Sequence, residues 1–406
     1  MQQVTEATDT SILASGIAGG VASGAVGPVL PAYDGGCIAN VMPLLVERAD
    51  RADRVEGADR GERGASACPD WFPEAVLGAD QVVLLVLDGL GWEQLSERRT
   101  LVPALAAGTG RPITSVAPST TAAAMTSITT GLAPGDHGLV GYRLHVGGSE
   151  VLNVLKWQTG AGDARGSLRP AVFQPHPAFL GRSVPVVTRT EFMGTGFTAA
   201  HLGGARLRGW RLASTLLVEV SKLLAAGEPL VCVYYDGLDK VAHEWGLEEH
   251  YEAELGAADQ IVEAILNRLP SGCSLVVISD HGQVSVGDRV VVLDADVMEH
   301  VSLLSGEGRF RWLHARKGHE EDLLGAAVSS VGDLAWVRSL QEVVDQGWLG
   351  GDPSDEVLAR LGDVALAARE PVAFLDPAHT AEITQVGRHG SLTSAEMLVP
   401  LLTWQS

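Results

Sequence analysis

Three apolar runs of strand length recur along the chain, and an aspartate directly follows each of them. They span residues 81–87, 230–235 and 274–279 and are rich in valine, leucine and isoleucine. None of them alternates apolar with polar positions, which is typical of strands buried on both faces of a parallel sheet. We therefore expect three strands of a parallel sheet that deliver polar residues to its carboxyl edge, where ligands bind in open α/β sheets.

Helical patterns lie between these runs. Apolar residues at positions 251, 255, 258, 262, 265 and 269 mark one face of a helix. A strand predicted over residues 113–118 leads into the hydroxyl residues 119–121, a run of small residues and Gly131, which is typical of a helix with both ends capped. Strands that alternate with helices predict a doubly wound α/β/α sandwich.

The catalytic domain is predicted over residues 81–406. The pattern changes between residues 287 and 377, where short strands at 289–293 and 309–314 alternate with helices near 320–331 and 355–361. No candidate catalytic residue occurs in that stretch. We therefore expect it to be an inserted smaller subdomain or cap within the larger domain.

Residues 1–80 are expected to form an irregular segment and linker that packs on the core. Residues 1–35 are rich in glycine, alanine and serine, and residues 37–46 indicate one short amphipathic helix. From 48 to 63 arginine alternates with acidic residues, which predicts a solvated helix face or a linker.

Composition limits the class of partner. The 406 residues are 46% hydrophobic, enough for a sizeable core, and the net charge of −21 argues against a nucleic-acid polymer as the main partner. We expect a small anionic substrate held by local charges such as metal ions. The sequence indicates no oligomeric state.

The cysteines and the hydropathy indicate a cytoplasmic protein. The four cysteines include no C-x-x-C pair, and no stretch offers about 18 consecutive apolar residues. Neither an oxidising compartment nor a membrane span is expected.

Metal-competent residues follow the predicted strands. They are Asp88, Asp239 with His243, Asp280 with His281 and, after the insert, His389. A single aspartate after a strand is more often a helix cap. Three carboxylates with three imidazoles instead suit Zn²⁺ or Mn²⁺, whereas Mg²⁺ and Ca²⁺ prefer oxygen ligands. Six ligands exceed the needs of one tetrahedral ion, so we expect two ions of the kind that clamp a phosphoryl group.

A nucleophile is predicted at the start of the helix that follows residues 113–118. A hydroxyl of Thr120 or Thr121 at a helix N-terminus can be ionised by a metal ion and favoured by the helix dipole, without a histidine base. His137, in the turn behind this helix, is expected to be structural.

These motifs resemble a known family. The matching stretches are Val86–Gly89, Thr121–Gly138, Asp239–His243, Asp280–Gly282 and His389–Gly390. Together and in this order they resemble the alkaline phosphatase superfamily, most closely its nucleotide pyrophosphatase/phosphodiesterase (type I phosphodiesterase) branch. Each motif alone is weak, but their common order makes the resemblance specific. It implies an alkaline phosphatase-like fold.

The resemblance also implies roles for individual residues. The first metal ion would be held by Asp88, Thr121, Asp280 and His281, and the second by Asp239, His243 and His389. Both would be divalent, zinc in the first instance and manganese as the alternative. Thr121 would be the nucleophile because it lies ten residues before Gly131, as in that branch, with Thr120 as the alternative. The expected reaction is hydrolysis of a phosphodiester or pyrophosphate through a covalent phospho-threonine.

One position departs from the branch. Tyr142 stands where the branch has an asparagine that helps to bind a phosphoryl oxygen, and tyrosine is bulkier and donates a single hydrogen bond. We expect Tyr142 to contact a small phosphorylated substrate, with a nucleotide as one candidate. Three alternatives follow: a metal-dependent phosphomonoesterase, a phosphonate hydrolase on the same site, and a catalytically silent metal-binding module. Sulfatases share the fold, but Pro118–Ala122 lacks their modified cysteine and arginine.

Overall fold

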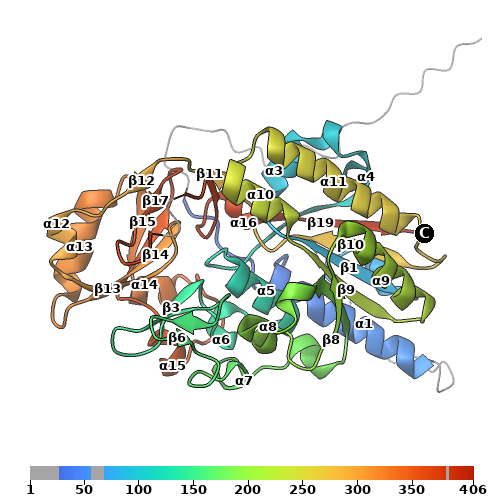
Figure 1. Ribbon diagram of the computed structural model, residues 1–406, viewed down its shortest axis with the longest axis horizontal. Coiled ribbons are helices and arrows are strands. Elements are labelled where there is room, and N and C mark those ends of the chain that lie inside the picture. Colours follow the sequence, from blue (N-terminus) through green and yellow to red (C-terminus); the bar gives the residue numbers. More distant parts are fainter. Residues whose placement is uncertain (1–26, 56–67, 381–383) are drawn as a thin grey trace, which may run out of the picture.

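A computed structural model describes residues 27–55, 68–380 and 384–406, and its largest element is a seven-stranded sheet (Figure 1). In spatial order its strands are β2 (Thr109–Thr114), β19 (Leu398–Gln405), β10 (Ser274–Ile278), β1 (Val82–Leu87), β9 (Leu230–Tyr235), β7 (Pro185–Arg189) and β8 (Arg206–Trp210). From β10 to β8 all neighbours run parallel, while β19 is antiparallel to both of its neighbours. The predicted central, mostly parallel sheet is confirmed, and the three apolar runs form its adjacent strands β10, β1 and β9.

Helices cover both faces of this sheet. Alternate side chains of β1 belong to two different cores, with Val82, Leu84 and Val86 in one and the residues between them in the other. The first core includes α1 (Val41–Val55), α5 (Thr121–Thr130) and α8 (Gly196–His201). The second includes α4 (Pro103–Ala106), α9 (Ala213–Ala225), α10 (Gly237–Trp245) and α11 (Glu249–Leu266). Figure 1 shows α4, α10 and α11 above the strands and α1, α5 and α8 below them, which is the predicted α/β/α layering.

Two smaller sheets flank the carboxyl edge of the large one. The first is antiparallel and contains β13 (Val301–Gly306), β14 (Phe310–Ala315), β16 (Val364–Ala368) and β15 (Ala335–Ser339). It packs with α12 (Ala295–Met298) and α13 (Glu320–Val331) around a hydrophobic core of its own. The second contains β3 (Arg143–His145), β4 (Val151–Asn153), β5 (Gln158–Thr159) and β6 (Gly162–Asp163).

A buried ion pair joins the β13–β16 sheet to the large sheet. The guanidinium of Arg309 donates to both carboxylate oxygens of Glu396, at 3.0 and 2.7 Å, and both side chains are fully buried. Glu396 lies in α16 (Ser394–Met397), directly before β19. The pair therefore fixes the start of β14 against the segment that leads into the central sheet.

Helix α1 extends past the expected helix end at residue 46, and its charged stretch is partly buried. Arg48 is 2% exposed and donates hydrogen bonds to the backbone carbonyls of Ala79 (2.9 and 2.6 Å), Asp80 and Pro229 (2.5 Å). The expectation of a solvated face is therefore wrong at Arg48, because its guanidinium satisfies carbonyls at the ends of two loops. The rest of the predicted charge run, from residue 56 onward, and residues 1–26 lie outside the described residues.

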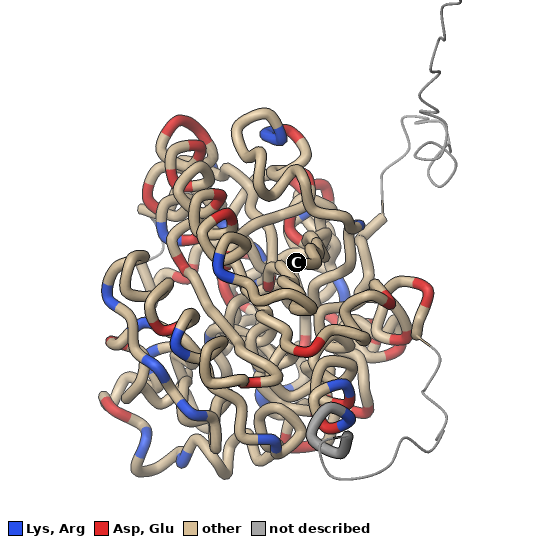
Figure 2. Tube along the Cα trace, turned by 90° about the vertical axis from the view of Figure 1, so that its right-hand side faces the viewer, with Lys and Arg blue, Asp and Glu red and all other residues tan. Residues whose placement is uncertain are grey.

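Among the described residues, none of the helices has the length and apolar character needed to cross a membrane. Figure 2 shows both acidic and basic residues on the side of the molecule that it presents. Acidic residues are more numerous in the sequence, with 50 Asp and Glu against 29 Lys and Arg.

The buried position of Arg48 generates a stability prediction. Arg48→Met should lower the free energy of unfolding by about 2–3 kcal/mol, because buried carbonyls lose a charged donor. Urea unfolding followed by circular dichroism measures this change. Arg51→Met on the same helix is the control, since its ion pair with Glu47 at 3.8 Å is partly exposed and should contribute less than about 0.5 kcal/mol. Equal losses in the two variants would contradict the structural role of Arg48.

Candidate active site

Three parallel neighbours, β10, β1 and β9, bring acidic residues to one edge of the sheet. Asp88 follows β1 directly, Asp280 lies just beyond β10, and Asp239 lies in the first turn of α10 after β9. The N–H of Asp239 donates to the carbonyl of Asp88 at 3.1 Å, so these two strand ends are in direct contact. Gly89 has a φ of +78°, and a Cβ there would lie 3.0 Å from the Asp239 Cα, so glycine allows this close approach.

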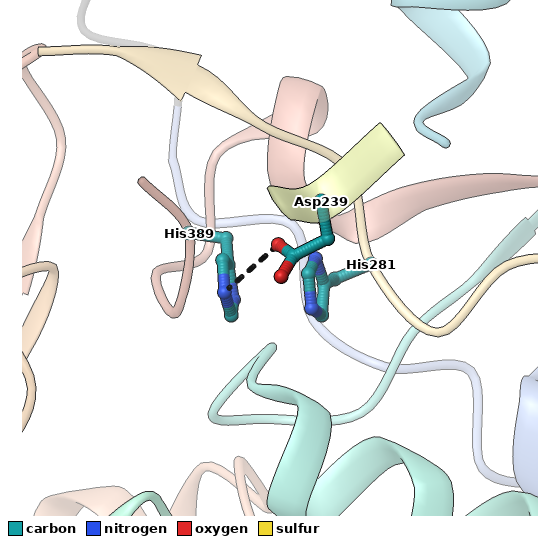
Figure 3. A group of neighbouring side chains, drawn as sticks. All are labelled: Asp239, His281 and His389. Carbon is teal, nitrogen blue, oxygen red and sulfur yellow. Dashed lines mark ion pairs between the residues drawn. The ribbon is translucent and has the colours of Figure 1, made fainter. Parts of the chain in front are cut away.

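His389 lies beside these acidic residues, although it is near the C-terminal end of the sequence. It follows β18 (Gly387–Arg388), and a bridge between Gly390 and Ser119 holds its backbone beside the start of α5. Figure 3 shows the rings of His389 and His281 side by side next to the carboxylate of Asp239, and Nε2 of His389 lies 3.6 Å from Oδ1 of Asp239. The rings of His281 and His389 stack with their centroids 3.5 Å apart.

The three histidines share one hydrogen-bonding arrangement. The Nδ1 atoms of His243, His281 and His389 lie 2.8, 3.1 and 2.9 Å from the backbone carbonyls of Gly387, Gly282 and Ser119. A carbonyl only accepts, so each Nδ1 must carry the hydrogen. Each Nε2 then presents a lone pair, which is the arrangement that metal-binding histidines adopt.

These lone pairs face carboxylates. The Nε2 of His281 lies 3.4 Å from an oxygen of both Asp88 and Asp280, and the Nε2 atoms of His243 and His389 lie 3.3 and 3.6 Å from Oδ1 of Asp239. A lone pair and a carboxylate repel each other unless a cation lies between them.

Burial and mutual repulsion disfavour charge at this site in the absence of a cation. Burial, reinforced by the charge of Asp280, raises the pKa of Asp88, and burial together with the charge of Asp239 raises the pKa of Asp280. Burial lowers the pKa of His281 to about 3 and that of His389 well below its usual value. The imidazoles of His281 and His389 are therefore neutral at pH 7 and available as ligands.

The residues present fit divalent metal ions. Oδ1 of Asp88 and Oδ2 of Asp280 are buried without a hydrogen-bond partner, which is costly unless a cation satisfies them. At this edge of the sheet, two groups of described residues have ligand atoms within 4.8 Å of one another. They are Asp88 with Asp280 and His281, and Asp239 with His281 and His389.

The structure brings together all seven residues that the sequence predicts as metal ligands. The structure differs from the prediction in how these residues divide between two ions. The prediction assigns His281 to the first ion alone, but its ligand atom lies close to both groups. His243 contacts the second group through Asp239, with its Nε2 3.3 Å from Oδ1 of that residue.

Thr121 is the first residue of α5, and its hydroxyl points into this centre. Its Oγ1 lies 3.1 Å from the Nε2 of His281. Thr120 is the extended residue that precedes the helix and is 2% exposed. Both threonines therefore lie at the centre, but of the two only Thr121 has a hydrogen bond to one of its histidines.

Two pockets meet at Thr121. The larger, of about 490 Å³, extends between α5, α8 and the central sheet and is lined largely by apolar side chains, among them Met125, Val186, Phe192, Phe197 and Tyr234. The smaller, of about 210 Å³, is polar and is lined by Tyr142, Asp239, His243, Glu307, Arg309, Arg388 and His389, among others. Thr121 and Leu155 line both pockets.

Tyr142, predicted to contact the substrate, lines the polar pocket. Its hydroxyl oxygen accepts a hydrogen bond from Nδ2 of Asn153 at 2.6 Å, and Oδ1 of Asn153 in turn accepts from the N–H of Lys156 at 3.0 Å. Asn153, at the end of β4, therefore holds the hydroxyl of Tyr142 in place from behind the residues that line the pockets.

Comparison with known proteins identifies the family. A family model described as type I phosphodiesterase/nucleotide pyrophosphatase matches residues 82–392. The chain belongs to this family. No match was found among the curated proteins with which the sequence was compared.

Solved structures of similar fold include phosphodiesterases and a phosphonate hydrolase. Murine ectonucleotide pyrophosphatase/phosphodiesterase 5 has a TM-score of 0.61 and 15% identity, over 79% of this chain and 87% of its own. An inactive form of it in complex with AMP has a TM-score of 0.59 and 14% identity, over the same shares of the two chains. Phosphonoacetate hydrolase from Sinorhizobium meliloti 1021, in complex with phosphonoformate, has a TM-score of 0.60 and 17% identity, over 80% of this chain and 90% of its own. At these identities the likeness shows the alkaline phosphatase-like fold.

Several residues that support the centre of this phosphodiesterase-family chain were not predicted from its sequence. The hydroxyl of Tyr234 donates to Asp88, and Nε2 of Gln283 donates to Oδ1 of Asp239 at 2.6 Å. Gln283 directly follows the Asp280–Gly282 motif, which is a signal that could have identified it. Tyr234 lies within an apolar strand, and nothing in the sequence distinguishes it from a core residue.

His137 is buried behind the candidate nucleophile, as expected. Its Nδ1 accepts from the N–H of Leu139 at 3.1 Å, so its Nε2 carries the hydrogen and donates to Oγ of Ser127 at 2.9 Å. Burial lowers the pKa of His137 to about 3. The fold therefore favours the neutral ring, and protonation of the unfolded chain removes stability as the pH falls below about 6.5.

The low pKa predicts a pH-dependent difference between variants. As the pH falls from 6.5 to 5, His137 should lower the free energy of unfolding of the parent by about 1.5 kcal/mol. In His137→Gln this contribution is absent, so the free energy of unfolding should fall by about 1.5 kcal/mol less than in the parent over the same interval. Urea unfolding of both proteins at several pH values measures the difference. The exposed His250→Gln serves as the control and should follow the parent. Identical pH dependence in parent and His137→Gln would contradict a buried neutral His137.

Proposed function

We propose that this protein hydrolyses phosphodiester or pyrophosphate bonds by two-metal phosphoryl transfer, with Thr121 as the nucleophile. The observation that carries the proposal is the position of the Thr121 hydroxyl. It begins a helix at the junction of two pockets and lies 3.1 Å from Nε2 of His281. That nitrogen is itself 3.4 Å from an oxygen of Asp88 and of Asp280, and both of these buried oxygens lack a hydrogen-bond partner.

The ligand set favours zinc, with manganese as the alternative. One ion would be held by Asp88, Thr121, Asp280 and His281, and the second by Asp239, His243 and His389. Three imidazoles among the ligands suit these metals better than Mg²⁺ or Ca²⁺. When bound, such ions supply the positive charge that favours an ionised hydroxyl and neutralises phosphoryl oxygens.

The chain's own residues would carry the reaction in two displacements. Thr121 Oγ1 loses its proton and forms a bond to phosphorus while the bond to the leaving oxygen breaks, and the leaving oxygen takes up a proton. Water then loses a proton as it attacks the phospho-threonine, and the Oγ1–P bond breaks while Oγ1 takes up a proton to restore the hydroxyl. The N-terminus of α5 offers backbone N–H groups and a positive dipole end to a phosphoryl oxygen.

A neighbouring structure supports the choice of threonine. Murine phosphodiesterase 5 in complex with AMP is an inactive variant in which one threonine is replaced by alanine. That complex also supports a nucleotide as one candidate ligand, and the large pocket beside Thr121 has room for an organic group of that size.

We also propose that residues 287–377 act as a cap on the catalytic domain of residues 81–406, and that within the N-terminal segment 1–80 the described residues 27–55 and 68–80 pack on the core. Glu307, Gly308 and Arg309 of the cap line the polar pocket, and α1 belongs to the same hydrophobic core as α5. A cytoplasmic location completes the proposal, supported by the absence of a disulfide among the four cysteines.

Replacement of the nucleophile tests the mechanism. Thr121→Ala should lower kcat/KM for bis(nitrophenyl) phosphate by about a thousandfold or more, because the attacking oxygen is removed. Thr120→Ala is the matched control and should lose less than about tenfold. EDTA should abolish activity in the parent and Zn²⁺ should restore it.

Intact-mass measurement after rapid quenching should detect a phosphorylated chain in the parent and not in Thr121→Ala. If Thr120→Ala abolishes turnover while Thr121→Ala does not, the nucleophile is Thr120. An unreactive parent that binds Zn²⁺ would support the silent metal-binding module instead.

A second candidate function is a phosphonate hydrolase or phosphomonoesterase on the same site. The phosphonoacetate hydrolase neighbour favours it, as does Tyr142 at the position of the branch's asparagine. Turnover of nitrophenyl phosphate and phosphonoacetate, measured beside the diester, separates these activities.

Tyr142 provides a test of substrate contact. Tyr142→Phe should lower kcat/KM for the preferred substrate about tenfold, because one hydrogen bond to a phosphoryl oxygen is lost while the ring remains. Steady-state kinetics on the mono- and diester measure the change. An unchanged kcat/KM would show that Tyr142 does not donate to the substrate.

A further inference from the structure

A second cluster of potential metal ligands lies in the β13–β16 subdomain, away from the active site. It contains His300, His319 and Asp322, whose ligand atoms lie within 4.8 Å of one another. These residues belong to the region of α12, β13 and α13, which Figure 1 shows at the opposite end of the subdomain from α10 and α16. The proposed phosphoryl-transfer reaction uses none of them.

The two histidines meet through the same ring atom. Nδ1 of His300 lies 2.9 Å from Nδ1 of His319. With Zn–N bonds of about 2.0–2.1 Å, two nitrogens on one tetrahedral ion lie about 3.3 Å apart, so a small ring movement would place both on one zinc ion. Without an ion, one ring must hold its hydrogen on Nδ1 to avoid the repulsion of two lone pairs.

Glu299 favours the metal-binding tautomer of His300. One of its carboxylate oxygens lies 3.5 Å from Nε2 of His300, the ring atom opposite Nδ1. A carboxylate at that distance favours a hydrogen on Nε2, which leaves the Nδ1 lone pair directed at His319. Metal-binding histidines are commonly oriented by a carboxylate in this way.

Rigid elements hold both histidines. His300 directly precedes β13, and its carbonyl accepts from the N–H of Arg316 at 2.7 Å, just after β14. His319 is the residue that precedes α13, and its N–H donates to the carbonyl of Arg316 at 2.9 Å. The relative position of the two rings is therefore fixed by one β-hairpin and by the helix that follows it.

We propose that His300, His319 and Asp322 bind a divalent transition metal ion, Zn²⁺ by ligand type, through two Nδ1 atoms and one carboxylate oxygen. His300 and His319 are partly buried and Asp322 is exposed, so a fourth position is open to water. The ion ties the N-terminus of α13 to the start of β13 and stabilises the subdomain whose β14 end lines the polar pocket. This site is separate from the catalytic centre and does not depend on the proposed activity.

The stoichiometry of zinc binding tests the site. The parent, His300→Ala/His319→Ala and His250→Ala are stripped with EDTA, titrated with Zn²⁺ and analysed for bound metal after gel filtration. The double variant should bind one equivalent fewer than the parent, whereas the exposed His250→Ala should match the parent. Equal zinc content in all three proteins would overturn the proposal and leave His300 and His319 as a hydrogen-bonded pair only.

Hydrogen exchange with a single, exposed substitution tests the site even if the double variant folds poorly. Asp322→Asn changes only an exposed side chain and should weaken this zinc site about tenfold or more. Hydrogen exchange of residues 299–322 should slow on Zn²⁺ addition in the parent and much less in Asp322→Asn. Zn²⁺ that leaves exchange in this segment unchanged in the parent, or changes it equally in Asp322→Asn, would contradict the proposal.

Discussion

The hydrogen bonds from three histidine rings to backbone carbonyls are the constraint on which the active site depends. Because Nδ1 of each ring is committed to a carbonyl of Gly387, Gly282 or Ser119, each Nε2 must face the carboxylates. Those three carbonyls come from segments far apart in the sequence. The site therefore forms only when β18, the end of β10 and the start of α5 are all in place, and the assembled residues form candidate metal-ligand groups.

The parallel sheet fixes the positions of the acidic residues in the site. β10, β1 and β9 are buried on both faces, and their carboxyl ends lie side by side because neighbouring parallel strands end at the same edge. The N–H of Asp88 donates to the carbonyl of Tyr235 at 2.9 Å, which continues the ladder one residue past the strand. Asp88 is thus held as firmly as a core residue although it presents an unpaired oxygen to the centre.

Different parts of the chain surround Thr121 on its two sides. The β3–β6 region and α8 contribute to the larger, apolar pocket, while the β13–β16 sheet contributes Glu307 and Arg309 to the polar one. The Arg309–Glu396 pair couples that sheet to the segment before β19. The metal-competent residues thus lie where the central sheet meets these two flanking regions, which supply the remaining walls of the pockets.

The sequence by itself determined three strands of the central sheet and the family, whereas the strand predicted over residues 113–118 lies earlier in the structure, at Thr109–Thr114. Unbroken apolar runs ending in aspartate marked β1, β9 and β10, and the order of motifs from Asp88 to His389 indicated the family, because both signals are local in the chain. It did not determine which side chains support the centre. Tyr234 reads as a core residue, Asn153 lies in a stretch without any motif, and Arg48 reads as a solvated charge. Their roles arise from contacts between segments distant in sequence: Tyr234 with Asp88, Asn153 with Tyr142, and Arg48 with Pro229. Only the tertiary structure decided these contacts, because a hydrogen bond between distant segments depends on how the layers pack and leaves no periodic signal in the chain.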